Sequence, residues 1–175
     1  MKHFILLSLL INSAFSAEIA AIGFNNGNGT QASTLDVVLS GINSAKKTIY
    51  VAAYAFTSKP IATALVAAKN RGVDIKIVAD QKENLGSYSV VTYLANSGIP
   101  VRLESDYKIF HNKFMIIDSK CVELGSYNYT KAASQNGSSG NAENAIIVCD
   151  NSLANTYTSQ FSYWFNHAEP LKSNY

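Results

Sequence analysis

The chain has 175 residues, of which 47% are hydrophobic and 15% are charged, and this composition excludes a disordered or low-complexity protein. The length accommodates one domain with a buried core. The formal charge of +2, from 14 basic and 12 acidic residues, is lower than is usual for a protein that grips long duplex through many phosphates, so any contact with nucleic acid is expected to be local and salt-sensitive.

The N-terminal segment has the pattern of a signal peptide. Lys2 supplies the positive charge, residues 4–11 form an apolar run, and residues 14–16 form a small-x-small site, so we expect cleavage after Ser16. The apolar run is too short for a stable membrane span, although a short buried helix or an uncleaved anchor are alternatives. Cleavage predicts a periplasmic or secreted protein, residues 17–175, with a charge of +1 because only Lys2 is lost.

The remaining chain alternates between strand and helix patterns. In chain order, we expect a strand at 18–24, a loop at 25–30, a helix with its apolar stripe at 35–42, a strand at 48–55, a helix from a cap at Thr57 or Ser58 to Gly72, a strand at 73–79, a helix at 88–96 and a strand at 99–103. A hairpin over 112–126 follows, then a short helical or irregular piece, a polar loop at 134–140, a strand at 145–148, a helix with an aromatic stripe at 153–165, and a frayed tail from Pro170.

Strands that alternate with helices predict an α/β fold in which a mixed β-sheet is sandwiched between helices on both faces. The chain contains neither an internal repeat nor a linker composition, so we expect residues 17–175 to form a single domain. The aromatic stripe of the last helix is expected to pack in the core.

The hairpin carries the densest cluster of chemically active side chains. His111 and Lys113 are two positions apart in a strand, so they share one face, whereas Asn112 and Asp118 point to the other. We expect a tight turn at residues 119–120 and a returning strand that ends near His111.

The returning strand is expected to bring Ser126 and Asn128 back towards the imidazole. An imidazole can attack phosphorus, and the ammonium of Lys113, the hydroxyl and the amide can hold the charged oxygens of a phosphodiester. Asp118, on the opposite face, is expected to order the hairpin, and Gly125 to allow a close backbone approach or a tight bend.

The fixed positions of this hairpin resemble the HKD signature of the phospholipase D superfamily: His111, Lys113, Asp118, Gly125, Ser126 and Asn128. The short length, the single copy of the motif, the segment 54–58 and the later pair Glu143-Asn144 resemble the small bacterial single-motif endonucleases of that superfamily. The resemblance covers nearly all of residues 17–175, and it implies the phospholipase D-like fold.

The resemblance also implies a mechanism. His111 would attack phosphorus to form a phosphohistidine, Lys113 and Asn128 would stabilise the charged oxygens, and Glu143 would hold the imidazole by a hydrogen bond. The leaving group needs a second, protonated histidine, which a single motif does not supply. We therefore expect an isologous homodimer in which two chains share one active site.

No metal or other cofactor is expected, because this chemistry does not require one and the scattered acids lack the spacing of a two-metal site. His167, near the end of the last helix, is expected to be a surface residue. Cys121 would lie opposite Cys149 if their strands pair with Gly125 opposite Ala145, and the two could form a disulfide or remain buried thiols.

The sequence therefore predicts a metal-independent phosphodiesterase, with a non-specific endonuclease acting on DNA, and on RNA as a further substrate, as the first interpretation. Two alternatives remain open. One is a phospholipase D-type hydrolase of lipid head groups, and the other is a non-catalytic module that binds nucleic acid or anionic lipid.

Overall fold

The computed structural model describes residues 16–25, 32–135 and 137–172. The predicted signal segment lies outside the described residues apart from Ser16, as do most of the predicted 25–30 loop and the tail beyond residue 172. Within the described ranges, no helix is long and apolar enough to cross a membrane.

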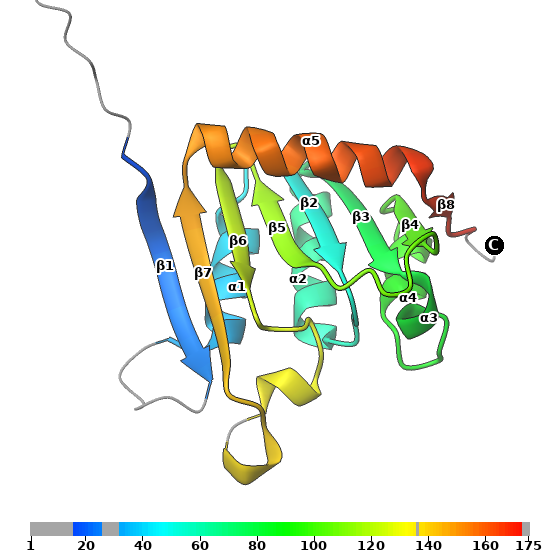
Figure 1. The fold of residues 1–175 in the computed structure, drawn as a ribbon, viewed down its shortest axis with the longest axis horizontal. Coiled ribbons are helices and arrows are strands. Elements are labelled where there is room, and N and C mark those ends of the chain that lie inside the picture. Colours follow the sequence, from blue (N-terminus) through cyan, green and yellow to red (C-terminus); the bar gives the residue numbers. More distant parts are fainter. Residues whose placement is uncertain (1–15, 26–31, 136, 173–175) are drawn as a thin grey trace, which may run out of the picture.

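An eight-stranded mixed sheet forms the centre of the molecule (Figure 1). Its strands are β1 (Glu18–Asn25), β2 (Thr48–Ala53), β3 (Asp74–Asp80), β4 (Val101–Glu104), β5 (Lys113–Ile117), β6 (Cys121–Gly125), β7 (Glu143–Cys149) and β8 (Glu169–Pro170). They lie in the order β1-β7-β6-β5-β2-β3-β4-β8. β2, β3 and β4 run parallel, and the other neighbours pair antiparallel.

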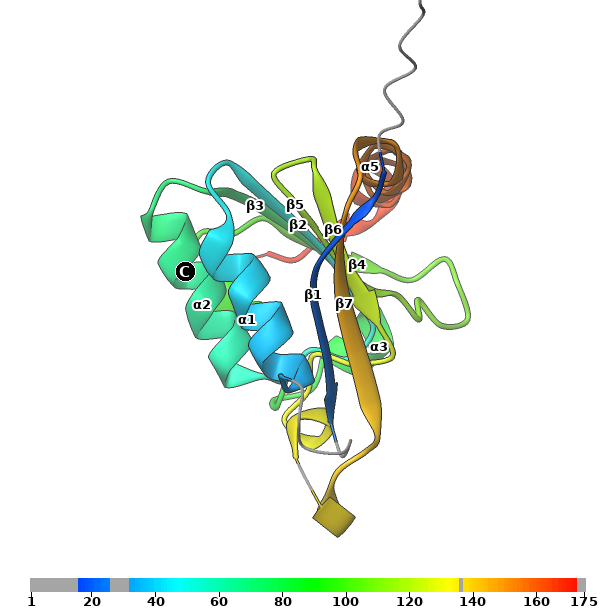
Figure 2. The same cartoon turned by 90° about the vertical axis from the view of Figure 1, so that its left-hand side faces the viewer.

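Helices cover both faces of this sheet, which confirms the predicted fold class. They are α1 (Thr34–Ser44), α2 (Lys59–Asn70), α3 (Gln81–Asn84), α4 (Val91–Asn96) and α5 (Asn151–His167), with short 3-10 turns at Ala132–Ser134 and Gly137–Ser139. Figures 1 and 2 show α1 and α2 on one face and α5 lying across the other.

The apolar run of β5 is explained by the two layers of core that it separates. Met115 and Ile117 belong to the cluster under α1 and α2, whereas Phe114 and Ile116 belong to the cluster under α5. A strand buried on both faces reads as continuously apolar rather than alternating. The register of this strand therefore fixes where the polar residues around its start, at 111–113, reach the end of the sheet.

The turn of the β5–β6 hairpin lies one residue earlier than predicted. Asp118 and Ser119 have φ values of 53° and 54°, and the Lys120 N–H donates to the Ile117 carbonyl at 3.0 Å. Two residues with positive φ form the turn that best matches the twist of a hairpin, and aspartate tolerates that conformation better than most residues. The structure therefore centres the turn on 118–119 instead of 119–120.

This turn places the Asp118 carboxylate against the chain that leads into β2. It accepts hydrogen bonds of 2.7–3.2 Å from the backbone N–H groups of Lys46, Lys47 and Thr48. Burial by itself raises the pKa of Asp118, but these backbone hydrogen bonds outweigh it and hold the pKa below its usual value. Asp118 orders the hairpin at the end of β5 away from His111.

Other boundaries differ from the predictions. The predicted helix at 88–96 begins at Val91, and the single turn α3 was not predicted. β7 begins at Glu143, so this acid is part of the strand. Ser58 occupies the N-cap of α2 but makes no side-chain capping bond.

The tail was predicted to be frayed from Pro170, but this residue pairs with β4. The Leu171 N–H also donates to the Val101 carbonyl at 2.9 Å.

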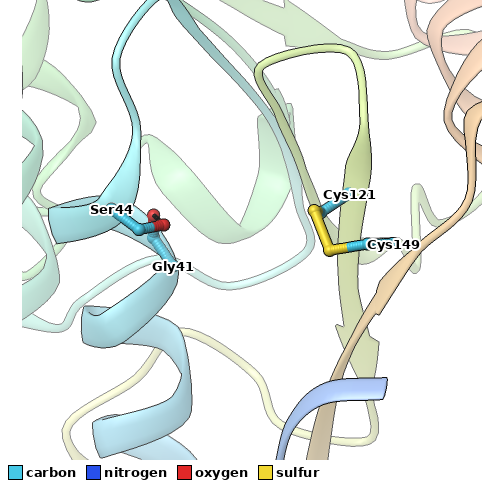
Figure 3. Close-up of a disulfide and its surroundings, with 4 residues drawn as sticks. All are labelled: Gly41, Ser44, Cys121 and Cys149. Carbon is cyan, nitrogen blue, oxygen red and sulfur yellow. Dashed lines mark hydrogen bonds between the residues drawn. A yellow bond between two sulfur atoms is a disulfide. The ribbon is translucent and has the colours of Figure 1, made fainter. Parts of the chain in front are cut away.

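A disulfide joins Cys121 of β6 to Cys149 of β7 (Figure 3). The two cysteines are direct cross-strand partners in a register that also pairs Gly125 with Ala145. Gly41 of α1, drawn in the same view, is where the helix approaches the sheet, since a Cβ there would lie 2.8 Å from the Cδ1 atom of Ile117.

Candidate active site

His111 and Lys113 lie together at the end of β5. The Lys113 Nζ atom is 3.2 Å from Nδ1 and 3.1 Å from Nε2 of the His111 ring, and it donates to the His111 carbonyl at 3.3 Å. His111 is exposed to solvent, and Lys113 is half-buried. An imidazole and an ammonium group therefore stand side by side at the surface, as the spacing of the motif predicts.

The ring of Tyr54 packs against the His111 imidazole. The two ring centroids are 4.6 Å apart with an interplanar angle of 61°, and the Tyr54 N–H donates to the Asn112 carbonyl at 2.7 Å. The Lys113 ammonium also lies 5.6 Å from the centroid of the Tyr54 ring. Tyr54 thus restricts the orientation of both side chains, a role that the sequence analysis did not assign to it.

Polar side chains from the end of β3 and from α3 hold the segments on either side of the site. The Asp80 carboxylate accepts from the backbone N–H of Phe110, immediately before His111, at 2.8 Å. The buried Asn84 amide donates to the Tyr54 carbonyl at 2.6 Å and accepts from the Phe56 N–H at 3.1 Å. The two residues fix the backbone that carries the imidazole and its neighbouring ring.

The charge on Lys113 is subject to two opposing influences. Burial lowers the pKa of its ammonium, and the negative charge of Glu143 partly offsets that effect, so that the pKa lies below its ordinary value of 10.5. Glu143 is therefore close enough to act on Lys113 electrostatically.

Glu143 does not hold the imidazole in this structure, and the predicted hydrogen bond needs correction. Its Oε2 atom accepts from the Ser126 hydroxyl, and its Oε1 atom accepts from the Asn141 amide at 3.1 Å. The strand order explains this, because Glu143 begins β7, Ser126 directly follows the neighbouring β6, and His111 lies before β5, one strand further away.

The same network engages the Ser126 hydroxyl. It donates to Glu143 and accepts from the Asn144 N–H at 3.0 Å. Ser126 nevertheless lines the same hollow as His111 and Lys113. To donate to a phosphate oxygen, as the sequence predicts, its proton would have to turn away from Glu143.

Gly125 and Asn128 flank this network. A Cβ on Gly125 would lie 2.2 Å from the Asn144 carbonyl oxygen, so only glycine permits this approach of β6 to β7. The Oδ1 atom of Asn128 is buried without a hydrogen-bond partner in the described part of the chain. Asn128 is not part of the wall of the hollow around His111.

The hollow itself has a volume of about 510 Å³ and opens at the end of the sheet. Besides His111, Lys113 and Ser126, its wall includes Tyr157 of α5, whose ring contacts that of Phe114 edge-on at 4.8 Å between centroids. The sequence placed Tyr157 only in a core stripe. Its position in the stripe, near the first turns of α5, gave no signal that it would reach this hollow.

A second carboxyl, Glu123 in the middle of β6, is buried and lies outside the hollow. It is 1% exposed, and the Tyr129 hydroxyl donates to it at 2.6 Å. Burial raises the pKa of Glu123 to about 8, against an opposing effect of the Tyr129 hydrogen bond. At neutral pH this carboxyl is therefore mostly protonated.

The described residues contain no group of three or more His, Cys, Asp or Glu side chains placed to hold a metal ion. His167, the other histidine in the described ranges, lies at the end of α5 with its Nδ1 atom 2.7 Å from the Tyr163 carbonyl. His111 is thus the one imidazole, among those described, that lies in the candidate active site.

A protein family and several known proteins resemble this chain over most of its length. The family model described as "Cardiolipin synthase, PLD-like domain" matches residues 38–164. The chain is 36% identical over 129 residues to a phospholipase D of Rickettsia typhi, and 32% identical over 165 residues to a phospholipase D of Rickettsia prowazekii. These matches cover 74% and 94% of this chain, and 60% and 77% of the two relatives.

A solved structure is also similar over nearly the whole chain. It is that of Nuc, a phospholipase D family member from Salmonella typhimurium, with a TM-score of 0.80 and 39% sequence identity. The similarity covers 90% of this chain and all of the Nuc chain.

Proposed function

Since this chain belongs to the phospholipase D superfamily, we propose that it is a phosphodiesterase, specifically a metal-independent endonuclease that hydrolyses DNA, with RNA as a further substrate. The observation that carries the proposal is the unshielded imidazole. His111 is exposed in a hollow that opens to solvent, so a phosphodiester within a long polymer can reach it directly.

The proposed reaction has two steps. A neutral His111 attacks phosphorus, and the departing alkoxide takes a proton from a second imidazole, which leaves a phosphohistidine. Water then attacks phosphorus, gives a proton to the second imidazole and displaces the His111 nitrogen, which frees the phosphate and returns both imidazoles to their starting states. In both steps the Lys113 ammonium stabilises the negative oxygens. Because its pKa is lowered, Lys113 loses its proton at a lower pH than an ordinary lysine does.

The second imidazole is proposed to come from a second copy of the chain. His167 lies at the end of α5 and is not among the described residues that line the hollow around His111, so it is not the proposed source of this proton. A two-fold axis beside the exposed His111 would bring two imidazoles and two copies of Lys113 around one phosphate. The homodimer with a shared site is therefore part of the proposal.

Hydrolysis of lipid head groups is the second candidate. The two Rickettsia relatives are named phospholipase D, and the chain spans only 60% of the length of the Rickettsia typhi protein. Strand β1 also exposes apolar side chains, with Ile22 46% and Phe24 42% exposed. The attacked group is the same phosphodiester, so the choice depends on how the rest of the substrate is held.

Export to the periplasm or the medium is proposed together with the endonuclease. The disulfide between Cys121 and Cys149 supports it, because such bonds persist in oxidising compartments. The predicted cleavage site after Ser16 remains a prediction.

The test uses the purified chain on plasmid DNA and on phosphatidylcholine vesicles, each in excess chelator, with His111→Ala chains as the control. We expect nicking and linearisation of the plasmid by the unaltered chain and none by the control. Release of choline without plasmid cleavage would assign the site to lipid, and no hydrolysis of either substrate would leave only a binding module.

A further inference from the structure

A second hollow lies at the N-terminal end of α2, separate from the one around His111. Its volume is about 730 Å³, and its wall includes Thr57, Lys59 and Lys131. A neighbouring hollow of about 340 Å³ shares Lys59 and Tyr88 with it and adds Tyr93. The two hollows therefore form one continuous surface, which we call the α2 groove.

The α2 groove carries positive charge without an opposing acid. Lys59 and Lys131 are both exposed, and neither has an ion-pair partner within 4.0 Å in the described part of the chain. Among the described residues, no aspartate or glutamate belongs to the wall of either hollow. Two unpaired ammonium groups at one concave surface favour a ligand with more than one negative charge.

Flat aromatic surface accompanies this charge. The Tyr88 side chain is 88% exposed, the highest value among the large hydrophobic side chains of the described residues, and Tyr93 is 51% exposed. A tyrosine ring this exposed does not contribute the stabilising free energy that its burial would give. Lysines interleaved with exposed rings are the pattern on which single-stranded nucleic acids bind, with phosphates on the cations and bases stacked on the rings.

The α2 groove is connected to the catalytic hollow by one short segment. Tyr54, at its start, packs on His111, and three residues later Thr57 forms part of the groove wall. The Thr57 hydroxyl accepts from the Lys131 N–H at 3.2 Å, which holds the two walls together. Three residues span at most about 11 Å, or roughly three to four stacked nucleotides.

From this arrangement we propose that the α2 groove binds the single strand of nucleic acid that continues from the phosphodiester held at His111. Lys59 and Lys131 contact its phosphates, and Tyr88 stacks on a base. The inference rests on the proposed endonuclease function and adds a preference for unpaired strands of more than about four nucleotides, because a stacked base must be free of its partner.

The test measures binding of fluorescent single-stranded DNA of two and of twelve nucleotides to dimer-competent, full-length His111→Ala chains, which cannot consume the ligand. Each lysine–phosphate contact contributes about 0.7 to the slope of log K against log salt for a single strand. For the double change Lys59→Gln and Lys131→Gln, which removes two such contacts, we therefore expect about 25-fold weaker binding of the twelve-mer at 0.1 M salt. For Tyr88→Ala we expect a loss of about fivefold or more. The affinity ratio of twelve-mer to dinucleotide should fall with each.

Matched controls exclude a general effect of charge or of surface rings. The double change Lys46→Gln and Lys47→Gln also removes two positive charges, but from the chain before β2, at the end of that strand away from the site. Tyr163→Ala removes a ring on α5 that is 52% exposed. The proposal requires these variants to bind the twelve-mer as the parent does. Circular dichroism melts verify that every variant is folded.

An unchanged twelve-mer affinity in both folded groove variants, or an equal loss in the controls, would overturn the proposal. The endonuclease function is judged separately, by plasmid cleavage with chains that keep His111. If that cleavage occurs while the groove variants bind normally, only the α2 groove is rejected. Tight twelve-mer binding through the groove without cleavage by the unaltered chain would instead reject the endonuclease.

Discussion

The buried carboxyl of Glu123 gives this protein a pH-dependent stability that a single substitution should remove. Its pKa rises from an ordinary value of 4.5 to about 8 in the folded chain. Between these values the folded state holds a proton that the unfolded state has lost, so the free energy of unfolding falls as the pH rises. Below pH 4.5 both states are protonated, and above pH 8 both are ionised.

The magnitude follows from the two pKa values. Each pH unit in this window costs about 1.4 kcal/mol, which gives about 3 kcal/mol at pH 7 and about 5 kcal/mol over the whole window. Glu123→Gln keeps an oxygen that accepts from the Tyr129 hydroxyl but has no proton to lose. We expect this variant to lack the decline in stability between pH 5 and pH 8.

The assay is urea unfolding followed by circular dichroism at half-unit pH steps, with the disulfide intact. Glu18→Gln, which alters an exposed carboxyl at the start of β1, is the matched control and should retain the parent's decline. Parallel pH profiles for Glu123→Gln and the parent would refute the assignment of a raised pKa to this carboxyl.

Four further outcomes are expected. His111→Ala should lower phosphodiester hydrolysis by on the order of 10³-fold or more while the melting curve stays that of the parent, and residual activity within tenfold of the parent would exclude it as the nucleophile. Excess EDTA should leave plasmid cleavage intact, whereas a loss restored by Mg²⁺ or Zn²⁺ would point to a metal enzyme. Under subunit exchange, His111→Ala chains mixed in excess with unaltered chains should reduce activity more than dilution does, and a linear dilution curve with proven exchange would contradict the shared site. Changing Cys121 and Cys149 to serine should cost about 3–4 kcal/mol in the free energy of unfolding, since the bond spans a separation of 28 residues, and an unchanged urea midpoint would show that the bond contributes nothing.

The sequence by itself determined the features that depend on neighbours along the chain. Alternation of strand and helix patterns predicted the mixed sheet with helices on both faces, and the two-residue period of a strand predicted that His111 and Lys113 would lie together. Asp118 was expected to order the hairpin, and its carboxylate accepts from the backbone N–H groups before β2, although the residue lies in the turn and not on a strand face. The pairing of Cys121 with Cys149 was left open between a disulfide and two thiols, and the register of β6 and β7 in the structure makes the two residues direct, bonded partners.

Only the tertiary structure decided which polar groups meet across strands. The sequence linked Glu143 to His111, but the strand order places Ser126 between them, and the carboxylate bonds to that hydroxyl instead. Asn84 could not be assigned a role either, because it acts on the Tyr54–Phe56 backbone from a helical turn about 30 positions away. Such contacts depend on how separate elements pack together, and the periodicity within one element does not predict this packing.

The buried Glu123 and the α2 groove show the same division. In the sequence, Glu123 is one acid in a short strand, and its raised pKa arises only when packing buries it beside Tyr129. Lys59, Tyr88 and Lys131 are far apart along the chain, and they share a surface because the start of α2, the segment before α4 and the segment after β6 meet at one end of the sheet. Local sequence specifies the elements and the face of each residue, whereas burial and long-range proximity exist only once the elements have packed.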